Sequence, residues 1–150
     1  MKRFQFPLQT VRNVRDLKRD EAERSFAEAS AVVTRAETEL AQAISKRNEA
    51  VESFSQMLKA GPLDASRAAH ESAYLDLLAK LISNSATRLA SLKSIRESKR
   101  NMAIRAAREA EVLEKLYHQQ QTRYDAFVNL DEQKNLDEFS IMSDGLRRQR

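Results

Sequence analysis

Lys59-Ala60-Gly61-Pro62-Leu63-Asp64 is the stretch of the sequence that decides the fold. Gly61 can take the left-handed conformation that ends a helix, and Pro62 cannot continue the helix before it. Asp64 is then placed to cap a following helix, because its carboxylate accepts hydrogen bonds from the free amides of the first turn. The stretch therefore predicts a tight turn at about residues 60–63 that joins two helices.

Away from this turn the sequence contains almost no helix breaker. Its 150 residues include only 2 Gly and 2 Pro, and the rest is rich in Ala, Leu, Glu, Lys, Arg and Gln, which is the composition of long helices. A loop-rich or β-rich fold would need more turn and β-branched residues. We predict an all-α fold in a single coiled-coil domain, residues 1–150, with a helix at about 5–59, a turn at 60–63, a longer helix at about 64–140 and a tail at 141–150.

Apolar residues repeat every seven positions along both predicted helices. In the first helix the two series are Phe26, Val33, Leu40, Arg47 and Phe54, and Ala22, Ala29, Ala36, Ala43, Ala50 and Met57. In the second helix they are Leu75, Ile82, Leu89, Arg96, Ala103, Ala110, Tyr117 and Tyr124, and Leu78, Ser85, Leu92, Lys99, Ala106, Leu113, Gln120 and Phe127. Within each helix the series alternate by three and four, which is the pattern of a coiled-coil seam. The pattern predicts an antiparallel two-helix coiled-coil hairpin.

The position of the turn also predicts which residues face each other. In a hairpin centred on residues 62 and 63, the numbers of facing residues add up to about 125. Ala36 then faces Leu89, which places a small side chain opposite a large one, as an interdigitated seam requires. At ~1.5 Å per residue the first arm is roughly 75 Å long and the second roughly 115 Å. Residues after about Gln120 are therefore expected to lack a partner within the chain.

Some apolar residues of both helices lie outside the predicted seam. A two-helix hairpin buries one stripe of each helix, so such residues are either exposed to water or covered by a partner. The flank along Leu81, Ile95 and Met102 leaves open a homodimer or a larger bundle. The full set comprises Ile44, Val51, Leu58, Tyr74, Leu77, Leu81, Ile95, Met102, Leu116 and Leu130.

The sharpest basic cluster is the stretch 88–108, which contains seven basic residues and one acidic residue. A stretch of this kind favours binding to a phosphate backbone or to an acidic protein surface. The predicted register offers another interpretation, in which acidic residues between 21 and 39 neutralise it from across the hairpin. No stacking aromatic residue lies in the stretch, so we expect no nucleic acid as a partner. A nucleic-acid-associated coiled coil that uses the stretch 88–108 is the alternative.

The sequence lacks the residue patterns of enzymes and metal proteins, so we expect no catalytic, cofactor-binding or metal site. It contains no Cys, and its two His residues, His70 and His118, are far apart in the chain. Glu114 and His118 are one helical turn apart, which is typical of an ordinary surface pair. With two glycines, the chain cannot form a Gly-rich phosphate loop. No stretch has the ~20 apolar residues of a membrane span, which predicts a cytoplasmic protein.

Two stretches of the sequence resemble a known family. Residues 4–12, FQFPLQTVR, resemble the opening of the flagellar FliJ family of export proteins. Residues 130–139, LDEQKNLDEF, resemble the closing segment of that family, with a Glu-Gln-Lys run before an Asp-Glu pair. The chain length, the two-helix layout and a turn near one third of the chain agree with the same family. The related injectisome export stalk proteins have the same shape and remain an alternative.

The resemblance implies a non-enzymatic component of the flagellar type III export apparatus, without a cofactor, associated peripherally with the inner membrane at the flagellar base. Members of the family are similar in shape to the central stalk of rotary ATPases. They link the export ATPase ring to the membrane export gate protein and help to escort export chaperones.

On this resemblance, the arms of the hairpin carry two partner-binding surfaces. The expected ATPase-facing residues lie in the unpaired end of the second helix and are Glu132, Lys134, Leu136, Asp137 and Glu138. The gate-facing patch is placed near residues 39–50 and 73–84 and comprises Ala43, Lys46, Ala50, Leu77 and Leu81. Leu77 matches the pattern of the family. Four further positions carry side chains that differ from those usual in the family, namely Ala43, Lys46, Ala50 and Lys80.

Overall fold

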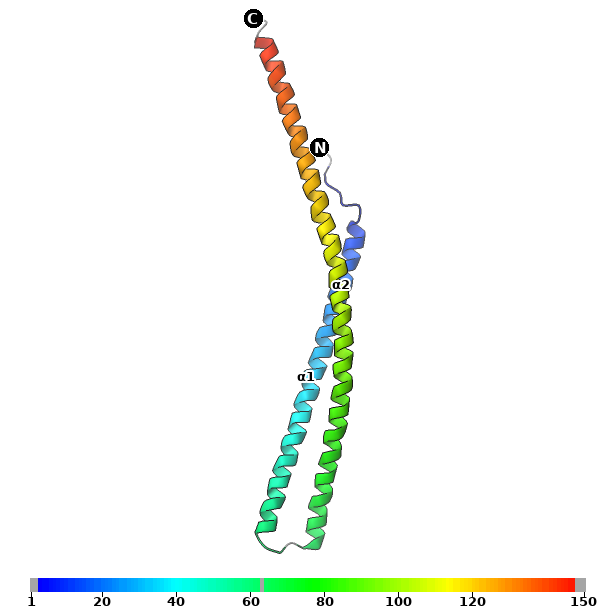
Figure 1. Ribbon diagram of the computed structural model, residues 1–150, viewed down its shortest axis with the longest axis vertical. Helices are drawn as coiled ribbons and strands as arrows, with labels where there is room; N and C mark the ends of the chain where they lie inside the picture. Colours follow the sequence, from blue (N-terminus) through cyan, green and yellow to red (C-terminus); the bar gives the residue numbers. More distant parts are fainter. Residues whose placement is uncertain (1–2, 63, 148–150) are drawn as a thin grey trace. The chain divides into compact units, whose positions relative to one another are not determined.

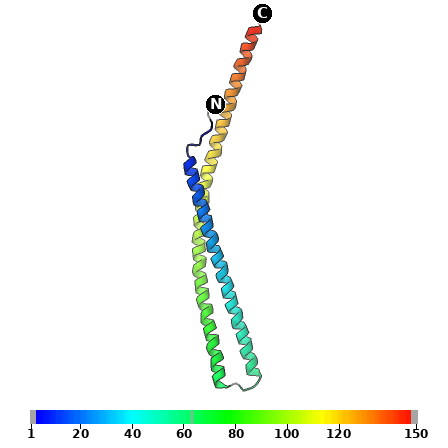
Figure 2. The same ribbon diagram turned by 180° about the vertical axis from the view of Figure 1, so that it is seen from behind.

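The computed structural model describes residues 3–62 and 64–147, with side chains as far as residue 138. Within these ranges the chain forms two α-helices and no strand, α1 (Gln9–Lys59) and the longer α2 (Ala65–Arg147). Figure 1 shows the two helices running side by side in opposite directions next to the turn that joins them, and the view from behind in Figure 2 agrees. The all-α antiparallel hairpin predicted from the sequence is confirmed.

The turn forms where the Gly-Pro pair predicts it. α1 closes with the amide of Ala60 donating to the carbonyl of Gln56 at 3.1 Å. Gly61 follows with a φ of 145°, a backbone conformation that is open to glycine and strained for residues with a side chain. At the start of α2, Asp64 Oδ1 accepts from the amide of Ser66 at 3.4 Å. Asp64 thus acts as the predicted N-cap, while Leu63 lies outside the described residues.

The helix ends differ from the sequence-based bounds at both termini. α1 begins at Gln9 instead of residue 5, because Pro7 lacks an amide hydrogen and disfavours a helical conformation at Phe6. The carbonyl of Phe6 instead accepts from the amide of Gln9 at 3.1 Å, which makes a turn ahead of the helix. α2 continues to Arg147 and not to residue 140, since the one glycine there only weakens a helix. Of the predicted tail, residues 148–150 lie outside the described residues.

The contacts of the chain group into two compact units, to each of which both helices contribute. The hairpin unit consists of residues 20–104 and contains the turn and the adjoining parts of α1 and α2. The terminal unit combines residues up to 19 with those from 105 onward.

The core of the hairpin unit is the predicted seam. Val33, Ala36 and Leu89 form its buried cluster, and Leu40 and Leu92 pack against them. The facing residues Ala36 and Leu89 are thus in contact, as the register predicts, and a small side chain meets a large one.

The burial of the other seam positions follows the heptad pattern. In both units the described side chains of the predicted series are buried or half-buried, except those of Arg47 and Phe127. Arg47 is exposed because a charged guanidinium stays in water while its aliphatic stem lies along the helix. Phe127 is 67% exposed and marks the end of the intramolecular seam.

Ion pairs flank the seam of the hairpin unit on both sides. Lys93 Nζ lies 2.8 Å from Glu37 Oε1, and Arg88 Nη1 lies 4.0 Å from Glu39 Oε2. The hydrogen bond and the positive charge of Lys93 lower the pKa of Glu37 below its ordinary value of 4.5. Acidic residues of α1 therefore neutralise part of the basic stretch of α2, which is the second interpretation that the sequence offered.

Candidate partner-binding surfaces

The residues before α1 form an aromatic cluster with α2 in the terminal unit. The ring of Phe6 meets Tyr117 edge to face, with 5.3 Å between the centroids, and Phe6 is 7% exposed. Phe4 lies against both tyrosines, with its ring centroid 5.7 Å from that of Tyr117 and 5.5 Å from that of Tyr124. We call Phe4, Phe6, Tyr117 and Tyr124 the aromatic cluster.

This cluster corrects the expected start of the unpaired arm. A helical segment at residues 4–6 would advance about 1.5 Å per residue, whereas an extended chain advances about 3.3 Å. Because Pro7 keeps this segment out of the helix, Phe4 reaches Tyr124, beyond Gln120. The prediction that residues after about Gln120 lack a partner is therefore wrong by about one helical turn.

Polar contacts hold the first turns of α1 beside the cluster. The guanidinium of Arg12 lies over the ring of Tyr117, 4.3 Å from its centroid, and Arg12 Nη2 is 2.6 Å from Glu114 Oε2. Arg15 forms an ion pair with Glu109 one turn farther along. A cation over an aromatic face is stabilising, and more so where water is partly excluded. The opening motif is thus anchored on α2 by Arg12 and two phenylalanines.

The expected ATPase-facing residues all lie on an exposed part of α2. Every described side chain from residue 129 to residue 138 is exposed, and this range contains Glu132, Lys134, Leu136, Asp137 and Glu138. Large apolar side chains lie among them, with Leu130 57% and Leu136 70% exposed. The structure therefore presents this segment as a mixed charged and apolar helix surface.

The expected gate-facing residues are divided between the surface and the seam of the hairpin unit. Leu77, Leu81 and Lys46 are exposed, and the two leucines lie one turn apart on α2. Ala43 is buried and Ala50 is half-buried. A partner cannot reach the side chain of Ala43 in the closed hairpin, where its small size lets α1 approach α2.

Further apolar side chains lie on the surface of both helices, because a two-helix hairpin buries only one stripe of each helix. Of the residues predicted to lie off the seam, Leu116 is half-buried and the others are exposed. The exposed set comprises Ile44, Val51, Leu58, Tyr74, Leu77, Leu81, Ile95, Met102 and Leu130.

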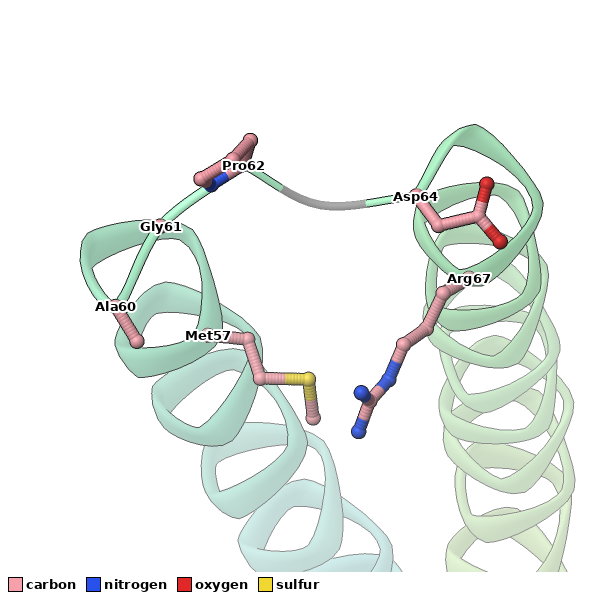
Figure 3. Close-up of a pocket in the computed structure, with 6 residues that line it drawn as sticks. All are labelled: Met57, Ala60, Gly61, Pro62, Asp64 and Arg67. Carbon is pink, nitrogen blue, oxygen red and sulfur yellow. The ribbon is translucent and has the colours of Figure 1, made fainter.

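An open cleft of about 390 Å³ lies at the turn, between the end of α1 and the start of α2 (Figure 3). Its lining residues are Met57, Ala60, Gly61, Pro62, Asp64 and Arg67. Arg67 extends from α2 toward the thioether of Met57, whereas the carboxylate of Asp64 is engaged as the cap of α2. The cleft offers an incoming group one guanidinium and no nucleophile or acid–base pair.

The surfaces of the described residues show neither a metal site nor a membrane span. In the described part of the chain no three His, Cys, Asp or Glu residues are grouped so as to hold a metal ion. His118 Nε2 lies 3.0 Å from Glu114 Oε1, the one-turn surface pair that the spacing predicts. No described helix combines the length and the apolar character needed to cross a membrane.

The anchored opening segment and the exposed end of α2 are the two parts of the chain that resemble the FliJ family, and a comparison with family models tests that resemblance. The family model described as "Flagellar FliJ protein" matches residues 4–149, nearly the whole chain. The chain belongs to the flagellar FliJ family. It is therefore a component of the flagellar protein export apparatus, in a family whose members are non-catalytic. No curated protein and no solved structure matches the chain.

The aromatic cluster is the part of the site that the sequence analysis missed. Its signal was present, because Phe4 and Phe6 alternate as in an extended segment and stand directly before Pro7. Tyr117 and Tyr124, one heptad apart in the seam of α2, offered the matching surface. An i, i+2 aromatic pair ahead of a helix therefore indicated an extended segment that packs on the partner helix.

Proposed function

We propose that the chain is a non-enzymatic stalk of the export apparatus that binds the export ATPase ring through the end of α2. The observation that carries the proposal is the run of exposed side chains from residue 129 to residue 138, beyond the aromatic cluster. A helix without tertiary support is marginal in water, so an apolar and charged helix surface of this kind is stabilised by a partner. Its charges, Glu132, Lys134, Asp137 and Glu138, suit a partner surface with complementary charge.

Truncation is the direct test of the ATPase contact. A chain that ends after Ala126 keeps Tyr124 and hence the aromatic cluster, so that α1 stays anchored. We expect this variant to lose co-elution with the flagellar export ATPase, while a chain that ends after Glu138 retains it. Full binding by the shorter chain would refute the assignment.

Charge reversal tests the contribution of the acidic pair. The double variant Asp137→Lys, Glu138→Lys should weaken ATPase binding, and the effect should shrink as the salt concentration rises, because exposed charges are screened. The matched control is Glu28→Lys, Asp76→Lys, which changes the net charge equally at two exposed positions of the hairpin unit. Equal affinity of the two variants at low salt would count against a role for Asp137 and Glu138.

We further propose that the hairpin unit contacts the membrane export gate, which would associate the chain peripherally with the inner membrane at the flagellar base. Lys46, Leu77 and Leu81 are exposed and can reach a partner, whereas Ala43 is buried, so the proposal assigns the contact to the three exposed residues. Leu77→Asp should abolish gate binding without unfolding the hairpin, because Leu77 is 62% exposed. Leu58→Asp, at a leucine of α1 that is 56% exposed, serves as the control, and equal loss in both variants would argue against a localised patch.

Escort of export chaperones completes the proposed role. Exposed apolar side chains mark sites of protein–protein interaction, and the described chain offers several exposed leucines to a chaperone. Binding of a purified export chaperone to the full chain, measured by titration calorimetry, tests this part. Absence of binding would remove chaperone escort and leave the stalk proposal intact.

A further inference from the structure

One flank of the hairpin unit carries a row of exposed residues at seven-residue spacing along α2. The row is Tyr74, Leu81, Arg88, Ile95 and Met102. Its four apolar members are between 43% and 56% exposed. Because the seam of α2 keeps its heptad register against α1, residues seven apart stay on the same flank of the hairpin. The row is therefore a continuous apolar stripe with one charge at its centre.

The row is symmetric about Arg88. In both directions the next member is an aliphatic residue, Leu81 or Ile95, and the one beyond it is a larger flexible or aromatic residue, Tyr74 or Met102. A two-fold symmetric interface uses the same patch on both copies, so that residue i meets residue j and j meets i. A stripe that has the same character when read in either direction meets this requirement for two antiparallel copies.

We propose that this flank binds a second copy of the chain, with the two α2 helices antiparallel and the two-fold axis at Arg88. Leu81 of one copy then faces Ile95 of the other, which pairs two aliphatic side chains. Tyr74 faces Met102, a sulfur–aromatic contact that is favourable in itself. The inference is independent of the proposed stalk function, although Leu81 also belongs to the proposed gate-facing patch.

The charge at the centre of the row is matched across the axis. Arg88 Nη1 is 4.0 Å from Glu39 Oε2 of the same chain, and both side chains are largely exposed. Two copies related by an axis at Arg88 bring two arginines and two glutamates together, so that each guanidinium lies between two carboxylates. A hollow of about 90 Å³ beside this pair, lined also by Val32, Arg35 and Ala36, leaves room for an incoming side chain.

The residues next to the row allow a second helix to approach. Three positions after Leu81, Arg88 and Ile95 the chain has small or uncharged polar residues, namely Asn84, Ser91 and Ser98. The distance between two packed helices is 8–10 Å and depends on the side chains at the contact, so short side chains beside the row favour a close approach. The opposite flank differs, because Lys93 and Arg100 lie on it.

The area sets the expected strength. A half-exposed side chain of this size offers on the order of 100 Å², so the eight apolar residues of two copies bury about 800 Å². With the polar neighbours the total reaches about 1,000–1,200 Å², at the lower edge of specific interfaces. We therefore expect a dimer with a dissociation constant in the micromolar range.

Cysteine cross-linking tests the geometry, and the absence of native Cys makes the experiment clean. Arg88→Cys should form a disulfide with itself, since the two copies of residue 88 meet at the axis and a disulfide needs Cα atoms within about 7 Å. Leu81→Cys and Ile95→Cys should each cross-link poorly alone and well when mixed. Ala86→Cys, an exposed position on the opposite flank of α2, is the control that should not cross-link.

A solution measurement decides the oligomeric state of the full chain without any partner protein, so failure here is distinct from failure of the stalk proposal. Sedimentation velocity from about 1 µM to about 1 mM should show the mass rising from 17.2 kDa to twice that value. Ile95→Asp should weaken the dimer at least about tenfold, whereas Ile44→Asp, at an exposed isoleucine on the other flank, should not.

The outcomes that overturn the proposal are specific. A mass of one chain over the whole range excludes the dimer. Strong self-cross-linking at residues 81 and 95 shows a parallel arrangement in place of the antiparallel one. Loss of the dimer in Ile44→Asp but not in Ile95→Asp places the interface on the opposite flank.

Discussion

Replacement of Phe6 by alanine tests whether the segment before α1 is anchored by the aromatic cluster. Phe6 is 7% exposed and meets Tyr117 edge to face at 5.3 Å. Burial of a phenylalanine contributes about 1.5–3 kcal/mol, and an edge-to-face aromatic pair adds about 0.5–1.5 kcal/mol. Because Phe6 and Tyr117 both belong to the terminal unit, we expect the loss, about 2–4 kcal/mol, to appear as local opening of that unit.

Native-state hydrogen exchange measures this opening directly. A loss of about 2–4 kcal/mol raises the open population by about 30- to 1,000-fold, because each 1.4 kcal/mol is a factor of ten. The hydrogen-bonded amides among residues 9–16 should therefore exchange faster in Phe6→Ala by a factor in this range. The amides around Val33, in the core of the hairpin unit, should keep their protection.

Phe127→Ala is the matched control, since it removes the same atoms from a side chain that is 67% exposed. We expect it to change the exchange of residues 9–16 by less than about threefold. If Phe6→Ala and Phe127→Ala gave equal exchange in this range, the cluster would contribute nothing to anchoring. Equal acceleration around Val33 and in residues 9–16 would instead show that the whole chain opens as one unit.

Three further substitutions test the hairpin unit. Val33→Ala should lower the free energy of unfolding by about 2 kcal/mol in urea titration, whereas Val32→Ala should change it by less than about 0.5 kcal/mol, because Val33 is 1% and Val32 37% exposed. Gly61→Ala should lower the free energy of unfolding by about 1–2 kcal/mol. Backbone strain alone causes this loss, since the φ of Gly61 is 145° and no atom lies within 4 Å of an added Cβ. An unchanged free energy of unfolding would mean that the turn relaxes freely. Lys93 lowers the pKa of Glu37, so the stabilisation by the Glu37 carboxylate is present above pH 4.5 and is lost as the pH falls through the lower pKa of the folded state. Glu37→Gln should therefore be less stable than the parent chain at pH 7 and equally stable near pH 2. A difference in stability that persists near pH 2 would exclude the ion pair with Lys93 as its origin.

The heptad pattern made the seam predictable, because burial in a two-helix hairpin depends on periodicity along each helix and hardly on anything else. Once the turn was fixed at Gly61 and Pro62, the register followed by counting, and the contact of Ala36 with Leu89 agrees with it. The off-seam leucines were predictable for the same reason. One stripe per helix is all that a single partner helix can cover.

The details at the chain ends were less predictable, because they depend on competition between local and tertiary terms. Helix propensity alone extends α1 back to residue 5, yet Pro7 keeps Phe4 and Phe6 out of the helix, and their rings pack on α2 instead. The expected gate-facing set mixed surface and seam residues for a similar reason. A resemblance assigns positions, and only the packing of Ala43 against α2 removes it from the accessible surface.

By itself the sequence determined the all-α class, the position of the turn, the register of the two helices and the family that the chain resembles. The first three follow from local rules, since breakers, caps and heptads act within a few residues of chain, whereas the resemblance to the family rests on the motifs at residues 4–12 and 130–139. The tertiary structure decided which surfaces are free: it anchored the opening motif on Tyr117 and Tyr124, buried Ala43 and left the end of α2 and one symmetric flank uncovered. Exposure is a property of what lies opposite in space, so only the packed chain could determine it.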